Sequence, residues 1–339
     1  MNKMFKKSFM LGALFILGAL LCCCGKGESK DASSDSGVSA DASSDVIYFG
    51  DESADASSDA AASSNASASA DADEGSEEDS AIDLSHGIDY EPEVIDGVDG
   101  LSAEAIPWGY TQDRDEDNRP VTALEFQEKY ADYNVDFIVD DADDQIYLTF
   151  DEGYENGYTP TILDTLKEKG ATGVFFVTMD YVKRNPDLVR RMIDEGHVVG
   201  NHTVHHPSEG LQSLSVADQQ AELNELHEYV KENFDYDMFV FRYPTGKFSE
   251  QSLAVVNNCG YRSVFWSFAY VDWDTENQLD PSEALETLTN ALHPGAIYLI
   301  HAVSETNSKI LGDFIDNAYE KGFTTGDYGE LMLQRMSSE

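Results

Sequence analysis

The sequence predicts an α/β fold, a parallel β-sheet covered by helices, and three features of its second half predict it. Short, continuously apolar segments alternate with amphipathic helical segments from residue 145 onward. Strands that are apolar throughout are typical of a sheet buried on both faces. Several of the helical segments end at glycine, for example at Gly170 and Gly322, as helices often do. The alternation gives about six or seven βα units, fewer than the eight of a standard barrel.

Each element follows from the local pattern of apolar residues and helix-stop signals. The predicted strands are residues 145–150, 171–178, 197–200, 238–242, 261–268 and 296–300. The predicted helices are residues 159–170, 186–196, 216–234, 250–260, 282–292 and 309–322.

The first 24 residues form a signal segment of the lipoprotein type. Lys3, Lys6 and Lys7 precede an apolar run over residues 9–21, which is the pattern of an export signal. The run is too short for a spanning helix, which needs about 20 residues. The cysteines at 22–24 resemble a lipidation site, although an ordinary cleaved signal remains an alternative. We therefore expect an exported protein, either held at the outer face of the cytoplasmic membrane by an N-terminal lipid or secreted.

Residues 25–102 are predicted to be a disordered, acidic tether, and residues 103–339 the catalytic domain. The segment from 27 to 100 holds 21 acidic residues and one lysine. It is rich in alanine and serine and too poor in large apolar side chains to form a core. We expect it to hold the catalytic domain away from a membrane surface.

The net charge of −44 over 339 residues excludes binding to a nucleic-acid backbone, which requires clustered lysine and arginine. The part after residue 100 still carries 16 basic and 44 acidic residues, a net charge of −28. We therefore expect no nucleic-acid partner, and contact with the membrane only through the N-terminal lipid. Monomers are expected.

Titratable side chains occur at or just beyond the ends of five predicted strands. They are Asp151, His202, Arg242, Asp272 and His301. The carboxyl ends of parallel strands meet at one edge, where α/β proteins place their active sites. We therefore expect these groups to converge.

The segment His202-Thr203-Val204-His205-His206 offers imidazoles four residues apart. If Thr203 begins a helical turn, the rings of His202 and His206 lie on one face and can bind zinc. The adjacent carboxylates of Asp151 and Glu152 can divide the roles of general base and metal ligand. This set predicts metal-assisted hydrolysis of an amide or ester. Surface histidines, a helix-capping turn at Asp151 and a structural Arg242–Asp151 ion pair remain alternatives.

Five segments in order resemble the motifs of the polysaccharide deacetylases, carbohydrate esterase family four, also called the NodB homology domain. They are residues 149–153 (TFDEG), 202–206 (HTVHH), 242–246 (RYPTG), 271–273 (VDW) and 299–301 (LIH). Further stretches, including those at 108–110 and 265–267, are similar to the branch that deacetylates N-acetylmuramic acid in peptidoglycan. The resemblance implies a distorted (β/α)7 barrel.

The resemblance also implies a role for each matching residue. Asp151 would be the base and His301 the acid, with Arg242 orienting Asp151 and Asp272 tuning His301. A divalent metal, expected to be Zn²⁺, would be held by Glu152, His202 and His206. The substrate groove would be formed by Tyr243, Pro244, Thr245, Trp273 and Leu299. This chain departs from the family at Glu152, where aspartate is usual, at Ala269, and at Thr245, which replaces an aromatic residue.

The sequence thus predicts a peptidoglycan N-deacetylase that binds glycan strands and acts on N-acetylmuramic acid. Two alternatives remain: a deacetylase or esterase of another extracellular polysaccharide, such as chitin or acetylxylan, and a catalytically impaired glycan-binding lipoprotein.

Overall fold

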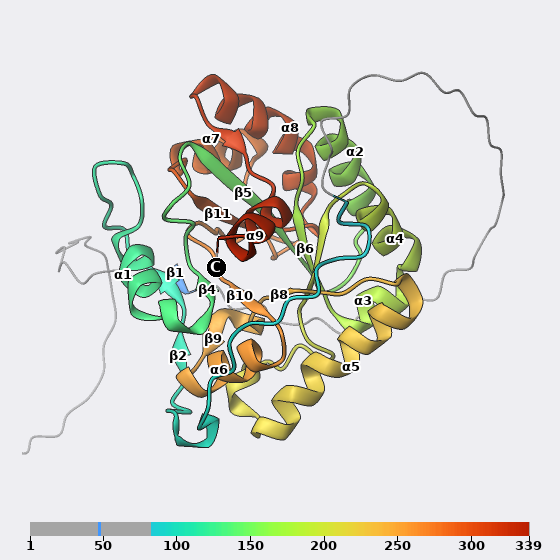
Figure 1. Ribbon diagram of the computed structural model, residues 1–339. Coiled ribbons are helices and arrows are strands. Elements are labelled where there is room, and N and C mark those ends of the chain that lie inside the picture. The colour runs from blue at the N-terminus through green and yellow to red at the C-terminus, as the bar shows by residue number, and fades with distance from the viewer. Residues whose placement is uncertain (1–46, 49–82, 339) are drawn as a thin grey trace, which may run out of the picture. The chain divides into compact units, whose positions relative to one another are not determined.

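A parallel β-sheet curls into a distorted barrel in the computed structural model, which describes residues 47–48 and 83–338 (Figure 1). The strand order is β11–β5–β6–β7–β8–β10–β4, with β12 paired to β5, and all these pairings are parallel. The strands are β4 (Val135–Asp136), β5 (Gln145–Glu152), β6 (Val174–Val177), β7 (Val198–Asn201), β8 (Val240–Phe241), β10 (Arg262–Val264), β11 (Ala296–His301) and β12 (Thr324–Thr325). The predicted α/β fold is confirmed.

Two short antiparallel pairs lie outside this sheet. They join β2 (Ile106–Pro107) to β9 (Lys247–Phe248), and β1 (Ile47–Tyr48) to β3 (Gly109–Tyr110).

The chain after β10 crosses to β11 and brings the two sides of the curled sheet together. Leu299 donates its backbone N–H to the carbonyl of Phe268 at 2.9 Å, and Phe268 bridges Tyr298. This crossing explains why the strand predicted over residues 261–268 ends at Val264 in the structure.

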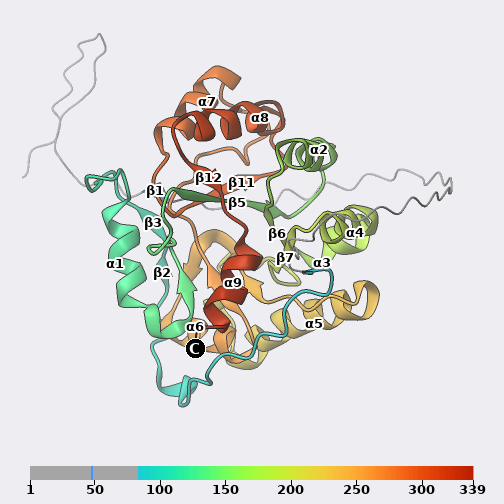
Figure 2. The same ribbon diagram turned by 45° about the horizontal axis from the view of Figure 1, so that its top comes forward.

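Helices surround the sheet (Figure 2). They are α1 (Val121–Lys129), α2 (Thr159–Lys169), α3 (Met179–Arg184), α4 (Pro186–Asp194), α5 (Val216–Phe234), α6 (Glu250–Asn258), α7 (Pro281–Asn290), α8 (Glu305–Glu320) and α9 (Tyr328–Met336). The sequence prediction lacked α1, α3 and α9. It also started α8 at residue 309, whereas the Ser304 hydroxyl accepts the N–H of Asn307 and caps the helix one turn earlier.

Helix α9 follows β12, which pairs with the first two residues of β5, and it lies in front of the curled sheet in Figure 1. Its anchor is Asp136 of β4, which is fully buried and accepts hydrogen bonds from Arg335 at 2.8 Å and Arg262 at 2.6 Å. Burial alone would raise the pKa of Asp136, but the two arginines outweigh it and the pKa lies below its ordinary value. Asp136 is therefore ionised and structural.

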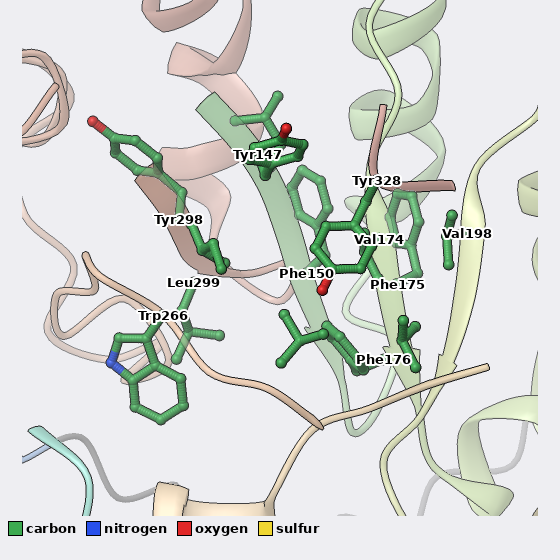
Figure 3. Packing of buried hydrophobic residues seen from close by; sticks show 14 of the residues in the cluster. Tyr147, Phe150, Val174, Phe175, Phe176, Val198, Trp266, Tyr298, Leu299 and Tyr328 are labelled. Carbon is green, nitrogen blue, oxygen red and sulfur yellow. The ribbon is translucent and has the colours of Figure 1, made fainter. Parts of the chain in front are cut away.

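Successive residues of the inner strands face opposite sides of the sheet, which decides what each side chain can reach. Phe150 stacks on Phe175 of the neighbouring strand at 4.8 Å between ring centroids (Figure 3). Phe176 faces the other way, and its ring centroid lies 4.2 Å from Cζ of the Arg242 guanidinium, which stacks over the ring. Asp151 is paired in register with Phe176 and so belongs to the face that carries Arg242.

Residues 83–102 pack against the catalytic domain, so the predicted domain boundary at residue 103 lies too far along the chain. Leu84 and Ile88 are buried, and Gly87 bridges Asp237. The side-chain amide of Asn258 makes two 2.8 Å hydrogen bonds to the backbone of Ile95. These few apolar and amide contacts are too sparse for a composition-based prediction to separate them from the acidic tether.

Replacing Gly87 with alanine is expected to destabilise the protein, because a Cβ there would lie 2.0 Å from the backbone oxygen of Asp237. The residue also has φ of +71°, so alanine pays about 1–2 kcal/mol in conformation alone. The control is Gly97→Ala, which has a similar φ of +74° but nothing within 4 Å. Denaturant unfolding should give a larger loss for Gly87→Ala. Equal losses would show that the contact at Asp237 contributes nothing.

Candidate active site

The side chains predicted at the strand ends converge at the carboxyl edge of the sheet. Asp151 is the penultimate residue of β5, and its register partner on the adjacent strand is His301, the last residue of β11. His202 follows β7 and Arg242 follows β8. All four are buried, with exposures of 7% or less, so their mutual interactions are only weakly screened by water.

Asp151 is held as a carboxylate by a fully buried arginine. Its Oδ1 accepts a 2.8 Å hydrogen bond from Nη1 of Arg242. The guanidinium is fixed by two further hydrogen bonds, to the backbone oxygens of Val264 at 3.0 Å and Phe265 at 2.9 Å. Burial raises the pKa of Asp151, but Arg242, His202 and His301 outweigh it, so the pKa lies below its ordinary value. Asp151 is therefore an ionised, oriented proton acceptor.

His202 and His206 lie side by side in a tight turn, with ring centroids 4.8 Å apart. The expected helical turn is wrong: Thr203 has φ of +72°. It is locked there because its N–H donates to Asn201 and its hydroxyl accepts the N–H of His206, each at 2.9 Å. The turn nevertheless brings the two rings together, as the spacing predicted.

The Nδ1 atom of His202 lies 2.9 Å from the carbonyl oxygen of Arg242. A carbonyl only accepts, so this contact places the proton on Nδ1 and leaves the lone pair on Nε2. Nε2 lies 3.5 Å from Oδ2 of Asp151. Burial lowers the pKa of His202 to about 4, which keeps the imidazole neutral near pH 7.

His301 is oriented by a network of buried polar side chains. Its Nδ1 lies 2.7 Å from Oδ1 of Asp272, and its backbone N–H donates to Oδ2 of Asp272 at 2.8 Å. Asn307 donates to the same Oδ2 at 2.6 Å and accepts from the hydroxyl of Tyr270. The carboxylate of Asp272 thus fixes the ring of His301, the arrangement that suits a general acid.

The structure does not place Glu152 with the two histidines. Asp151 and Glu152 are consecutive in β5, so they face opposite sides of the sheet. Oε1 of Glu152 accepts a 3.4 Å hydrogen bond from Thr159 of α2, and Oε2 has no hydrogen-bond partner. Burial, and then the nearby Glu155, raise the pKa of Glu152 well above its ordinary value.

The expected three-residue metal site is therefore not assembled. Within residues 47–48 and 83–338, no group of three or more histidine, cysteine, aspartate or glutamate side chains is arranged to hold a metal ion. Two imidazoles, those of His202 and His206, do lie together, and His202 lies beside the carboxylate of Asp151. Imidazole nitrogen is a preferred ligand of zinc, so this pair fits a zinc ion and Glu152 does not.

Asp151, His202, His206 and His301 line a narrow cavity of about 10 Å³, the space that about one water molecule needs. Its lining includes four of the five predicted groove residues: Tyr243, Thr245, Trp273 and Leu299. Pro244 is buried but does not line the cavity. Only a small group at the end of a substrate can enter such a space.

Trp266 and Gly246 also line the cavity, although the sequence does not predict either of them as a site residue. A Cβ on Gly246 would lie 2.7 Å from the indole of Trp266, so glycine is required for the two to pack. From the sequence, the stretch at 265–267 shows only a similarity to the same stretch of the family. Its role was not readable because Trp266 lies beyond β10, on the crossing segment.

Acid is expected to destabilise the protein between about pH 6.5 and 4. Burial lowers the pKa values of His197, His202 and His293 from 6.5 to about 4. The unfolded chain takes up these protons first, so the free energy of unfolding falls as the pH drops through this window, by about 1.4 kcal/mol per pH unit for each histidine.

The test is the slope of unfolding free energy against pH for His197→Asn, where the amide oxygen can accept the 3.2 Å hydrogen bond from the Gly173 N–H. The slope should become shallower by about 1.4 kcal/mol per pH unit, which is the contribution of one histidine. His205→Asn is the control, because that side chain is 75% exposed. An unchanged slope in His197→Asn would contradict the prediction.

Comparison with known proteins places this arrangement among carbohydrate-active enzymes. Residues 139–264 match the family described as polysaccharide deacetylase. The chain is 41% identical over 241 residues to the peptidoglycan-N-acetylmuramic acid deacetylase PdaA of Bacillus subtilis, covering 69% of this chain and 90% of that protein.

Two solved structures show the same fold. The structure of Bacillus subtilis PdaA, a family 4 carbohydrate esterase, has a TM-score of 0.65 and 38% identity, covering 69% of this chain and all of that one. A family 4 carbohydrate esterase from Bacillus anthracis has a TM-score of 0.55 and 33% identity, covering 68% of this chain and 98% of that one.

Proposed function

Since this chain belongs to the polysaccharide deacetylase family, we propose that it hydrolyses the N-acetyl group of N-acetylmuramic acid in peptidoglycan and releases acetate. The observation that carries the proposal is the pairing, across one small cavity, of an ionised Asp151 with an oriented His301. A fixed base and a fixed acid on two sides of a reacting group are what amide hydrolysis needs. The 41% identity to a muramic acid deacetylase supports this sugar.

Asp151 accepts the proton of the attacking water, and Arg242 keeps the carboxylate ionised and aimed at the cavity. His301 donates a proton to the departing sugar amine, while Asp272 holds its Nδ1 proton and so fixes the opposite nitrogen toward the cavity. Trp273 and Leu299 line the cavity and would contact the acetyl methyl group.

His202 and His206 would hold a zinc ion. When bound, zinc polarises a carbonyl and lowers the pKa of water. The 2.9 Å contact of His202 with the Arg242 carbonyl fixes the tautomer that leaves Nε2 available; metal-binding histidines typically donate their other ring N–H in this way.

The substrate places the enzyme outside the cytoplasmic membrane, because peptidoglycan lies there. The lipoprotein-type signal at residues 1–24 is the proposed route, and it lies outside the described residues. Within the part of the chain that the structure describes, no helix has the length and apolarity to cross a bilayer.

The direct test is mass spectrometry of peptidoglycan fragments treated with the full-length protein and zinc, with and without prior removal of the peptides by an amidase. Loss of one acetyl group from the muramic acid residue is expected. Loss of the acetyl group only from N-acetylglucosamine would contradict the proposed sugar. Activity only on chitin oligomers or acetylxylan would favour those polysaccharides as the substrate. Binding of glycan without acetate release would show an impaired enzyme.

The hydroxyl of Thr245 is expected to bind the substrate. It lines the cavity, and its Oγ1 is buried without a hydrogen-bond partner. The backbone has φ of +61°, a costly conformation for a β-branched residue that is typical of functional sites. Thr245→Val keeps the shape and strain but removes the hydroxyl, so KM should rise about threefold to tenfold without loss of stability.

Thr245→Ser is the matched control, since it keeps the hydroxyl and removes the β-branch. In steady-state kinetics, the KM of Thr245→Ser should be close to the wild-type value. A KM for Thr245→Val equal to that of the wild type would show that the hydroxyl makes no contact with substrate.

A further inference from the structure

A second groove, of about 560 Å³, lies on the outer side of the segment that leads into Asp272. Residues 268–271 form one wall, residues 110–118 and α7 the others. It shares no lining residue with the catalytic cavity. A ligand in this groove is therefore not the acetyl group that reacts, but another part of the substrate.

This groove is an electrostatic exception on a strongly acidic domain. No aspartate or glutamate lines it, although the chain after residue 100 has a net charge of −28. The two other large open grooves each include three carboxylates in their linings. The single charged residue in its lining is Arg114, so the groove favours an anion.

Arg114 is held in place but not neutralised. One nitrogen, Nη1, donates to the carbonyls of Thr111 at 2.6 Å and Asp113 at 3.2 Å. The guanidinium lies 5.3 Å from the ring centroid of Tyr110. Among the residues that the structure describes, the hydrogen bonds of Arg114 go to these two carbonyls and no carboxylate makes an ion pair with it, although the nearby charge of Asp113 acts on it. Arg119, five residues on, is by contrast paired with Asp115 at 2.7 Å.

The wall of the groove is connected to the acid side of the catalytic site. Tyr270 lines the groove, and its hydroxyl donates to Asn307. Asn307 in turn donates to Asp272 at 2.6 Å, and Asp272 holds His301. The exposed Val271 adds an apolar surface on the same segment. The groove therefore adjoins the residues that hold the acid side of the catalytic site.

We propose that Arg114 binds the free lactyl carboxylate of a neighbouring muramic acid in the glycan strand, and that the groove is a subsite for that sugar. The inference rests on the proposed function. In a strand stripped of peptides, the lactyl group of muramic acid carries the carboxylate, and the alternating N-acetylglucosamine is uncharged. The groove is larger than a lactyl group, so it has room for the sugar ring as well. Guanidinium–carboxylate pairing can be bidentate, which gives orientation in addition to affinity.

The test compares Arg114→Gln with the wild type on muramyl oligosaccharides of two disaccharide repeats with free lactyl groups. KM should rise about tenfold, the effect of roughly 1.4 kcal/mol, with kcat unchanged. On a single disaccharide, which has no neighbouring muramic acid, and on oligosaccharides whose lactyl groups carry peptides, KM should be unchanged. Arg119→Gln is the matched control and should behave as wild type on all three substrates. Arg114→Lys should recover part of the affinity.

An equal KM for Arg114→Gln and wild type on the free-lactyl substrate would overturn the proposal, as would an equal rise on the single disaccharide. A rise confined to peptide-bearing strands would assign the groove to the peptide instead. If the wild-type protein deacetylates none of the muramyl substrates, the proposed function fails. In that case, calorimetry of the two-repeat oligosaccharide with the wild type and with Arg114→Gln still tests the role of Arg114. Weaker binding by Arg114→Gln supports the proposal, and equal binding overturns it.

Discussion

Replacing Asp151 with asparagine is expected to lower kcat for acetate release by about a hundredfold to ten-thousandfold, the contribution of a general base. Asparagine has nearly the same shape and can still accept the 2.8 Å hydrogen bond from Arg242. It cannot take a proton from water. The substitution also leaves a buried guanidinium without its counter-charge, so the free energy of unfolding should fall by about 1–3 kcal/mol.

The chain offers a matched control for the stability effect. Asp136 is likewise a buried carboxylate paired with arginines, but its side chain contacts Arg262 and, from α9, Arg335 and does not line the catalytic cavity. Asp136→Asn should destabilise the protein while the folded enzyme keeps its kcat. Acetate release and denaturant unfolding, measured on both variants, separate the two effects. An Asp151→Asn enzyme with more than about a tenth of the wild-type kcat would contradict the role of base.

Replacing His202 with alanine is expected to abolish both zinc binding and acetate release. Within the described residues, His202 and His206 are the two imidazoles that lie together to hold the ion. Removing one of them should weaken zinc affinity by about a hundredfold or more, a larger loss than the removal of an outer contact causes. Titration calorimetry with zinc and metal analysis of the purified protein measure binding independently of activity. His205→Ala is the control in the same turn, because His205 points outward and pairs with Glu222 at 2.6 Å.

The variant Glu152→Gln tests whether Glu152 is a metal ligand, as the sequence predicts, or lies away from the two histidines, as in the structure. Glu152 lies on the opposite face of β5 from Asp151 and contacts Thr159 of α2. Its replacement should therefore leave zinc affinity unchanged. A large loss of affinity in Glu152→Gln would restore the three-ligand set that the sequence predicted. Full acetate release by metal-free wild-type protein would instead remove any need for the ion.

Part of the fold and of the site could be predicted from the sequence, because it depends on the local pattern of apolar residues. The apolar period and the glycine stops identified the strands and helices of the βα units. In a parallel sheet all strands end at the same edge, so Asp151, His202, Arg242 and His301 had to meet once the strands were correct.

The tertiary structure alone decided the features that depend on contacts between distant segments. The side of β5 on which Glu152 lies is set by where the strand ends, and a shift of one residue exchanges the two faces. The packing of residues 83–102 depends on amides such as Asn258 more than 160 positions away. The lengths of β10 and α8, the place of Trp266 and the position of Arg114 in a groove that no carboxylate lines follow from long-range packing that no local window contains. Sequence by itself determined which chemical groups this protein brings to the edge of its sheet. Long-range packing determined which of them face the same space.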